Sequence, residues 1–322
     1  MARSAKRLRA VDLFCGAGGA SAGARLAGVE VAAAVDSWSL AAEVYEDNFP
    51  TAQHRLSKAG ELDLAALCRD LSSPIDLLIA SPECTSHTCA KGNGAGSEPS
   101  RMTAFEVIRY AKALEPRWIV IENVVHMRSW SRYEEWRSAL MALGYHLTDQ
   151  VLNAADFGVP QARKRLFVCA DREVKPRLVR PSRARRKCAR AILDLNGSYS
   201  FSPLYAKGRA NATLARARRA IEALGPRKPF LLVYYGSDGA GGWQPLDVPL
   251  RTVTTLDRFA LVRPKTRGYE MRMLQVGELR KAMGFPAAFV LRRGTRRDRI
   301  HLLGNAVCPP VMAAVLRSLT RS

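Results

Sequence analysis

Residues Ile75–Gly92, IDLLIASPECTSHTCAKG, contain the feature around which the rest of the chain can be arranged. The stretch begins with a short apolar run that stops at Pro82, and Cys84 follows in a polar, glycine-containing segment. A short apolar run bounded by turn residues is typical of a buried strand. Because open α/β folds bind ligands at the carboxyl ends of their strands, this stretch predicts a thiol at the ligand-binding edge of a sheet.

A second apolar run, Arg117–Val124, predicts another buried strand, and this one delivers Glu122. A lone cysteine is more often an inert buried thiol, and a lone glutamate is as often a satisfied strand-end carboxylate. However, a thiol and a carboxylate at the ends of two strands of one sheet indicate a nucleophile with an acid/base partner. Cys84, His87 and Cys89 match C-x-x-H-x-C, but no clear fourth ligand follows, so no metal site is predicted.

The amino-terminal sequence predicts a strand, a glycine turn, a helix and a second strand that ends at Asp36. This is the layout of a nucleoside-binding βαβ unit, in which glycines let the backbone approach the ligand and the carboxylate accepts hydrogen bonds from ribose hydroxyls. Gly16 and Gly18 match the first two glycines of G-x-G-x-x-G, whereas Ser21 occupies the third position. The difference favours a nucleoside ligand such as S-adenosylmethionine over a dinucleotide, and it disfavours a nicotinamide dehydrogenase.

Composition and charge indicate a globular protein with a polyanionic partner. The chain has 322 residues, 48% of them apolar, a net charge of +21 and an isoelectric point near 10.2. Such a balance favours nucleic acid over a merely solvated basic surface. The seven cysteines lack framework spacing, which predicts reduced thiols in the cytoplasm. We expect a soluble protein, because we find neither a signal peptide nor the roughly 20 apolar residues of a membrane helix.

The composition changes after Asp171, where arginine-, lysine- and proline-rich sequence extends to Lys228. We interpret this change as a domain boundary. Short β-like segments follow at Phe230–Tyr235, Arg251–Thr255 and Phe259–Val262. They predict a smaller, irregular, basic second domain that contains β-strands.

Two helix starts can also be predicted. Thr103-x-x-Glu106 has the spacing of a capping box. Pro309 and Pro310 are suited to the first turn of a helix that continues to Leu319.

Six motifs, taken in order along the chain, carry a resemblance to a known family. They are Asp12–Gly19, the Cys84 segment, Glu122–Val124, Gln161–Arg165, Gly284–Pro286 and Gly304–Val307. The series resembles the motifs of DNA cytosine-5 methyltransferases and spans Val11–Val311, nearly the whole chain. The resemblance implies a Rossmann-like, doubly wound α/β domain that binds S-adenosylmethionine and a smaller target-recognition domain. It also implies that the last segment returns to the first domain, so we expect a catalytic domain of residues 1–172 plus 300–322 and a recognition domain and hinge of 173–299.

The resemblance also implies the site residues. Cys84 would add to C6 of cytosine and Glu122 would protonate N3, while two arginines would orient the base and the carboxylate, Arg163 and Arg165. A base inside a duplex cannot be reached in this way, so we expect the target cytosine to be flipped out. The residues expected to bind S-adenosylmethionine are Phe14, Gly16, Gly18, Gly19, Asp36, Trp38, Glu61 and Asn305. The residues expected to bind DNA are Arg251, Thr252, Thr254 and Thr255.

Two of these assignments have open alternatives. Phe14 and Trp38 either pack on the adenine of the cofactor or belong to the core. The carboxylate that family members place near the adenine amine is either Glu61 or Asp63.

The cysteine segment departs from the commoner family pattern. Most members have proline before the cysteine and glutamine after it, whereas this chain has Glu83 and Thr85. A proline-acid-cysteine segment resembles phage-like and prophage-like members, so an active enzyme is still expected. An ionised Glu83 would raise the pKa of the Cys84 thiol unless its carboxylate points away.

The expected activity is methylation of C5 of a flipped cytosine in duplex DNA at a specific sequence, with S-adenosylmethionine as the methyl donor. The alternatives are the same chemistry on tRNA and an inactive DNA-binding protein. The expected partner is double-stranded DNA, with a cognate restriction endonuclease as an additional candidate and no membrane. We expect a monomer that is cytoplasmic and nucleoid-associated, encoded by a bacterium or a phage.

Overall fold

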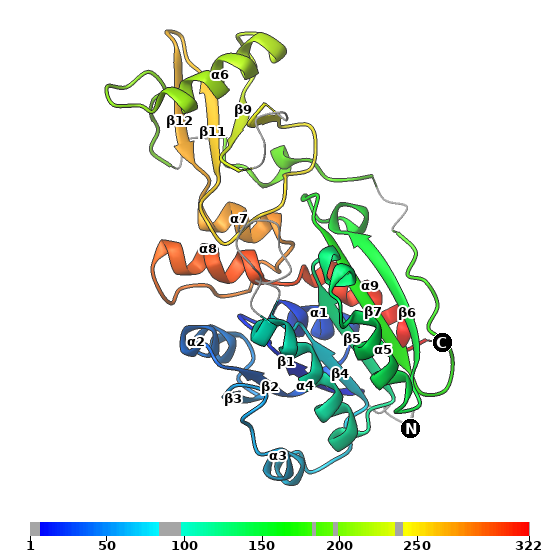
Figure 1. The fold of residues 1–322 in the computed structure, drawn as a ribbon. Coiled ribbons are helices and arrows are strands. Elements are labelled where there is room, and N and C mark those ends of the chain that lie inside the picture. The colour runs from blue at the N-terminus through cyan, green and yellow to red at the C-terminus, as the bar shows by residue number, and fades with distance from the viewer. Residues whose placement is uncertain (1–6, 84–97, 182–184, 196–198, 236–240, 322) are drawn as a thin grey trace, which may run out of the picture.

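The computed structural model describes residues 7–83, 98–181, 185–195, 199–235 and 241–321. Two sheets organise this part of the chain, and the larger one carries helices on both faces (Figure 1). The predicted doubly wound α/β domain with a second, smaller β-containing domain is confirmed.

The larger sheet has seven strands in the order β3-β2-β1-β4-β5-β7-β6. The strands are β1 Arg9–Leu13, β2 Glu30–Asp36, β3 Gln53–Leu56, β4 Leu77–Ala80, β5 Trp118–Asn123, β6 His146–Asn153 and β7 Lys164–Asp171. Strands β1 to β5 are parallel, whereas β7 runs antiparallel to both β5 and β6. The strand order reverses between β1 and β4, which is the place where open α/β sheets bind ligands.

Strand β4, in the middle of the sheet, is apolar along its whole length because both of its faces are buried. In β4, Leu77 and Ile79 pack into the core on one face, while Leu78 and Ala80 pack into the core on the other, and all four are 0% exposed. Parallel strands covered on both sides need such continuous apolar sequence. The run that follows Ile75 therefore becomes the centre of the sheet and delivers Pro82 to its carboxyl edge.

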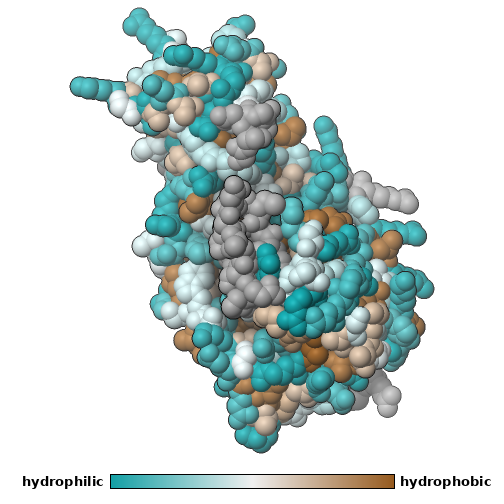
Figure 2. All heavy atoms as spheres, viewed as in Figure 1, coloured by the Kyte–Doolittle hydropathy of each residue, from teal (hydrophilic) through white to brown (hydrophobic). Residues whose placement is uncertain are grey.

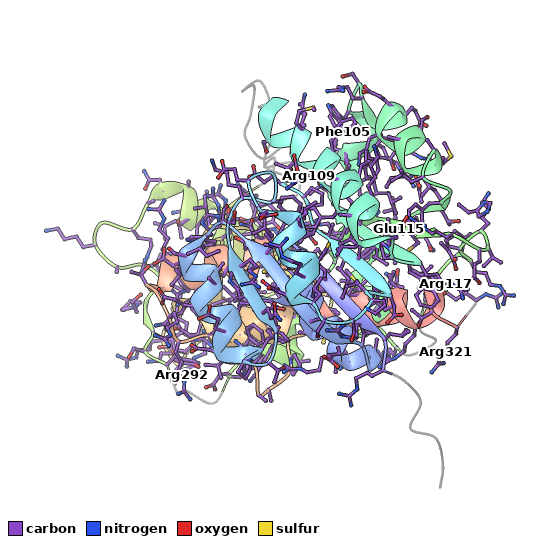
Figure 3. The ribbon with its side chains drawn as sticks, turned by 90° about the horizontal axis from the view of Figure 1, so that it is seen from below. Phe105, Arg109, Glu115, Arg117, Arg292 and Arg321 are labelled. Atoms are coloured by element: carbon purple, nitrogen blue, oxygen red, sulfur yellow. The ribbon has the colours of Figure 1, made fainter. Side chains whose placement is uncertain are left out.

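Helices cover each face of this sheet. On one face lie α1 Gly19–Ala27, α2 Ser39–Asn48 and α9 Pro309–Leu319, and on the other α3 Leu64–Asp70, α4 Glu98–Leu114 and α5 Tyr133–Met141. Seen from below, Phe105 and Arg109 follow one another along α4, and Glu115 comes just after its end (Figure 3). The predicted helix start at Pro309 is confirmed, and α9 packs against α1, so the carboxyl terminus returns to the first domain (Figure 1).

The second sheet has five antiparallel strands in the order β10-β9-β11-β12-β8. Its strands are β8 Ser202–Pro203, β9 Phe230–Val233, β10 Trp243–Pro245, β11 Phe259–Pro264 and β12 Tyr269–Met273. Helix α6, Asn211–Leu224, buries Ala217 and Ala220 against this sheet. Two of the predicted β segments are confirmed as β9 and β11, but Arg251–Thr255 is wrong as a strand: it is an extended loop next to a single bridge between Gln161 and Leu250.

Two more helices connect the second sheet to the first domain, α7 Val276–Ala282 and α8 Arg296–Asn305. They lie between the two sheets (Figure 1). The predicted helix start at Thr103 is wrong, because α4 already begins at Glu98 and its first turns include Thr103. The proposed domain limits, 1–172 plus 300–322 and 173–299, stay a prediction.

The stretch Arg296–Leu319 is long and apolar enough to cross a membrane by composition, yet 72% of its most apolar window is buried inside the fold. It comprises α8 and α9, and α9 is part of the core of the first domain. Its apolar character is therefore that of core helices.

Candidate active site

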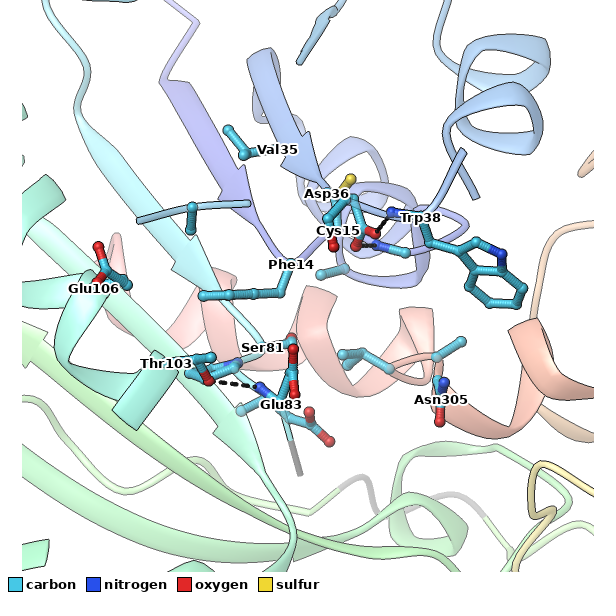
Figure 4. Close-up of a pocket in the computed structure, with 18 of the residues that line it drawn as sticks. Phe14, Cys15, Val35, Asp36, Trp38, Ser81, Glu83, Thr103, Glu106 and Asn305 are labelled. Atoms are coloured by element: carbon cyan, nitrogen blue, oxygen red, sulfur yellow. Dashed lines mark hydrogen bonds between the residues drawn. The ribbon is translucent and has the colours of Figure 1, made fainter. Parts of the chain in front are cut away.

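A cavity of about 530 Å³ opens at the carboxyl edge of β1, β2, β4 and β5 (Figure 4). Its walls come from the turn after β1, the loop after β3, α4, the amino end of β7 and the turn after α8. The predicted site residues that line it are Phe14, Gly16, Asp36, Trp38, Glu61, Glu122, Arg163, Arg165 and Asn305. The topology thus gathers residues from both ends of the sequence at one edge of the sheet.

Asp36 joins the glycine turn to the start of α2. Its Oδ2 accepts a hydrogen bond from the Gly16 amide at 2.8 Å, and its Oδ1 accepts one from the Trp38 amide at 2.9 Å (Figure 4). Each carboxylate oxygen retains a further lone pair that can accept from a ribose hydroxyl. Phe14, just before the turn, has a φ of 57°, a conformation that non-glycine residues adopt at tight or functional sites.

The glycines of the turn have different roles. A Cβ at Gly16, where φ is 51°, would meet no heavy atom within 4 Å, so the backbone there is open toward the cavity that it lines. A Cβ at Gly18 would collide with the ring of Phe49, and one at Gly19 would lie 2.5 Å from the carbonyl oxygen of Val307. Gly16 therefore faces the cavity, whereas Gly18 and Gly19 lie against protein, and cofactor contact by these glycines stays a prediction.

Ser21, which replaces the third glycine of the nucleotide fingerprint, binds a buried acid. Its hydroxyl donates to Oδ2 of Asp12 at 2.6 Å and lies 2.8 Å from the hydroxyl of Tyr45. Burial raises the pKa of Asp12 to about 7, although the bond from Ser21 lowers it. Ser21, whose presence disfavours a dinucleotide ligand, thus links β1, α1 and α2 beneath the glycine turn.

Phe14 and Trp38 both line the cavity, and each also packs on the core that lies behind it. The Trp38 ring stands 5.0 Å from the His301 ring, measured between centroids, which connects α2 with α8. Asn305, at the end of α8, is exposed and also lines the cavity (Figure 4). The core alternative is therefore met in part for both aromatic residues, and their packing on adenine stays a prediction.

Of the two candidate carboxylates after β3, only Glu61 lines the cavity. It forms an exposed ion pair with Lys58 at 2.8 Å. Asp63 instead caps α3 by accepting two backbone amides at 2.9 and 3.1 Å. Arg109 of α4, labelled in Figure 3, donates to the carbonyls of residues 59 and 62 and so holds the loop that bears Glu61.

Glu122 is 6% exposed at the end of β5, and Nε of Arg165 lies 3.3 Å from its Oε1. The antiparallel register explains the pairing, because β7 begins where β5 ends, with Glu122 opposite Phe167. Burial raises the pKa of Glu122, and the charges of Arg165 and Arg163 oppose that shift. The result is a carboxyl group that can hold a proton at higher pH than an exposed glutamate can.

Arg163 lines the cavity and also bonds to backbone carbonyls of both domains. Its Nη1 donates to the carbonyl of Val253 at 2.8 Å, and its Nη2 donates to those of Gly304 at 2.7 Å and Ala306 at 3.1 Å. The Gly304 backbone also packs against the Thr254 peptide, which follows Val253 in the chain. A Cβ at position 304 would lie 2.5 Å from the carbonyl oxygen of Thr254. These bonds join the two domains at the cavity wall, and the charges of both arginines act to lower the pKa of Glu122, which burial raises. That Arg163 also orients the base and the carboxylate stays a prediction.

The chain leaves β4 at the rim of the cavity. Asn123 donates to the Pro82 carbonyl at 3.1 Å, and the Glu83 amide donates to the Thr103 hydroxyl at 3.2 Å (Figure 4). Sequence reasoning missed both supporting contacts. Cys84 lies outside the described residues, as does the C-x-x-H-x-C pattern, and no metal-binding group of His, Cys, Asp and Glu occurs in the parts that are described.

The four predicted DNA-binding residues occur in the loop before β11. The Thr252 hydroxyl donates to the carbonyl of residue 162 at 2.9 Å, and the Thr254 hydroxyl donates to that of Leu256 at 3.3 Å. Arg251 and Thr255 are partly exposed in the same loop. The loop thus lies where the second domain meets the cavity wall, and DNA contact by these four residues stays a prediction.

Comparison with known proteins identifies relatives of this chain. The family model described as C-5 cytosine-specific DNA methylase matches residues 8–321. The Type II methyltransferase M.HgiDI of Herpetosiphon aurantiacus is 36% identical over 165 residues, which is 51% of this chain and 52% of that protein. The chain spans about half the length of the first curated relatives that it matches.

Solved structures share the fold. A putative DNA modification methyltransferase encoded within a prophage of E. coli has a TM-score of 0.71 at 18% identity, with 98% of this chain and 100% of that chain covered. The S. pombe Dnmt2 methyltransferase has a TM-score of 0.70 at 18% identity, with 98% and 99% covered. At this level of identity the likeness extends to the fold alone.

Proposed function

We propose that this chain, which belongs to the C-5 cytosine-specific DNA methylase family, methylates C5 of cytosine in double-stranded DNA with S-adenosylmethionine as the donor. One observation carries the proposal. A single cavity joins a nucleoside-binding wall around Asp36 to a buried carboxyl group, Glu122, at the point where the chain continues from Glu83 into Cys84.

The cavity has groups that suit S-adenosylmethionine. Gly16 leaves open space for a ligand, and Asp36 can accept from ribose hydroxyls. Trp38 supplies an aromatic face, and Glu61 could accept from the adenine amine. When bound, the cofactor supplies an electrophilic methyl group.

Cytosine C5 is too poor a nucleophile to accept that methyl group unaided. We propose that the Cys84 thiolate forms a bond to C6 while Glu122 donates a proton to N3, which makes C5 nucleophilic. After methylation, a base removes the C5 proton, the bond from Cys84 to C6 breaks, and N3 returns its proton to Glu122. The raised pKa of Glu122 suits the donor role, and Arg165 holds the carboxyl group in place.

The charge distribution supports a nucleic acid substrate. On the face shown in Figure 2, hydrophilic side chains project from the outer end of the second domain. Exposed basic residues of this domain include Lys207, Arg218, Arg227, Lys228 and Arg267. Since Glu122 is buried in the first domain, a cytosine must be flipped out of the DNA duplex to reach its carboxyl group.

The proposal also covers the oligomeric state of the enzyme, its partner and its location. We also propose that the enzyme acts as a monomer. The Type II methyltransferase names of the relatives support a cognate restriction endonuclease as a partner. DNA as substrate implies a cytoplasmic, nucleoid-associated protein.

The proposal is tested by nucleoside mass spectrometry of host DNA and tRNA from a strain that lacks cytosine methylation. Wild type should produce 5-methylcytosine in DNA, and Cys84→Ala should abolish it. Cys68→Ala is the matched control, because Cys68 is an exposed cysteine outside the cavity. Methylation found in tRNA alone, or in neither nucleic acid despite cofactor binding, would overturn the DNA assignment.

A further inference from the structure

The loop that leads from Leu250 to β11 is held on one side by the first domain. Val253 is 1% exposed; its amide donates to Oε1 of Gln161 at 2.8 Å, and its carbonyl accepts from Arg163 at 2.8 Å. The following peptide packs on the backbone of Gly304. This side of the loop therefore forms a continuous, buried contact with the cavity wall, to which Arg163 and Gly304 both belong.

The other side of the loop is held just as firmly. Asp257 forms an ion pair with Arg296 of α8, with 2.7 Å between Oδ2 and Nη2. Arg258 donates to the carbonyl of Tyr234 at 3.0 Å. In Figure 1 this yellow part of the chain descends from the second sheet toward α7 and α8, so the loop lies between the two domains.

Leu256 lies between these two sets of contacts and is 43% exposed. An exposed leucine alone has no special meaning, because much of any protein surface is apolar. Here, however, the backbone is fixed on both sides, and Thr254 closes the turn by donating to the Leu256 carbonyl at 3.3 Å. An apolar side chain is thus presented to solvent from a loop whose preceding residues, Val253 and Thr254, contact the cavity-lining Arg163 and Gly304.

We propose that Leu256 is a wedge that packs against the base step beside the extruded cytosine, which rests on the proposed function of base-flipping DNA methylation. Extrusion of a base removes stacking from its neighbours, and an apolar side chain can replace part of that contact. A wedge works best when it is already ordered, because no entropy is lost on binding. The two anchored flanks of the loop provide that order.

The test compares two DNA duplexes that contain the target sequence, which is found first by sequencing host DNA methylated by the wild type. In one duplex the target cytosine is paired, and in the other it lies opposite an abasic site, where extrusion costs less. Leu256→Ala should lower kcat/KM on the paired duplex by roughly tenfold or more, and the abasic duplex should restore it to near the wild-type value. Leu256→Met, which keeps the apolar bulk, should stay near wild type on both.

Val248→Ala is the control, because Val248 is 42% exposed and precedes the same loop. It should change neither rate. An equal loss for Leu256→Ala on both duplexes would assign the residue to loop structure or base reading and overturn the wedge, as would no loss on the paired duplex. Absence of methylation by the wild type would instead refute the proposed function.

Discussion

Replacing Arg163 by methionine tests whether this arginine joins the two domains or acts on the substrate. The substitution keeps most of the apolar stem but removes the donors to the buried carbonyls of Val253, Gly304 and Ala306. A buried carbonyl that loses its partner costs about 1–3 kcal/mol, so the three together predict a loss of about 3–9 kcal/mol in the free energy of unfolding. That is a large part of the 5–15 kcal/mol that typically stabilises a folded domain.

Arg165→Met is the comparison. Arg165 contacts Glu122 and the carbonyl of Lys164, and Glu122 can become neutral when its partner is removed, because burial already raises its pKa. We therefore expect a loss of about 1 kcal/mol or less in stability but a severe loss of methyl transfer. Urea unfolding followed by tryptophan fluorescence measures the first effect, and a methylation assay on soluble protein measures the second. Equal urea midpoints for Arg163→Met and wild type would refute this reasoning.

Three further predictions concern single acids. Asp12 has a pKa raised to about 7, so the folded protein keeps a proton that the unfolded chain releases near pH 4. The free energy of unfolding should therefore fall by up to roughly 4 kcal/mol as the pH rises from about 4 to about 7. Unfolding curves for Asp12→Asn should show a much smaller fall over the same range. Asp36→Ala should weaken S-adenosylmethionine binding roughly 10- to 100-fold in calorimetry, and unchanged affinity would remove Asp36 from the cofactor site. Glu122→Gln should slow methylation roughly 100- to 10,000-fold while leaving cofactor affinity unchanged, and a normal rate would exclude an acid at this position.

Local sequence predicted the parts of the fold that depend on apolar runs. Strands β1, β2, β4 and β5 are where such runs predicted them, because strands buried on both faces are mostly apolar. Helices α6 and α8 and strand β6 were missed. Their sequences, such as RRDRIHLLGN in α8, mix charged and apolar residues, and they become ordered by packing against distant elements.

In the candidate site too, the sequence predicted the local features but not the contacts between distant residues. Asp36 and Glu122 could be found from strand ends, which are local features. The bonds of Arg163 reach residues 90 to 143 positions away, and nothing in the neighbouring sequence distinguishes this arginine from Arg165. The support of Glu83 by Thr103 also depends on how α4 packs against the end of β4, so a capping box was a reasonable but wrong interpretation of Thr103.

Covalent trapping can test directly whether Cys84 bonds to C6 of a cytosine in DNA. A duplex whose target cytosine carries fluorine at C5 can accept the thiolate and the methyl group, but the fluorine cannot leave as a proton does. With S-adenosylmethionine present, the account predicts a denaturant-resistant protein–DNA complex whose peptide map places the DNA on Cys84. No complex from an enzyme that methylates the normal duplex, or a complex through another cysteine, would contradict it.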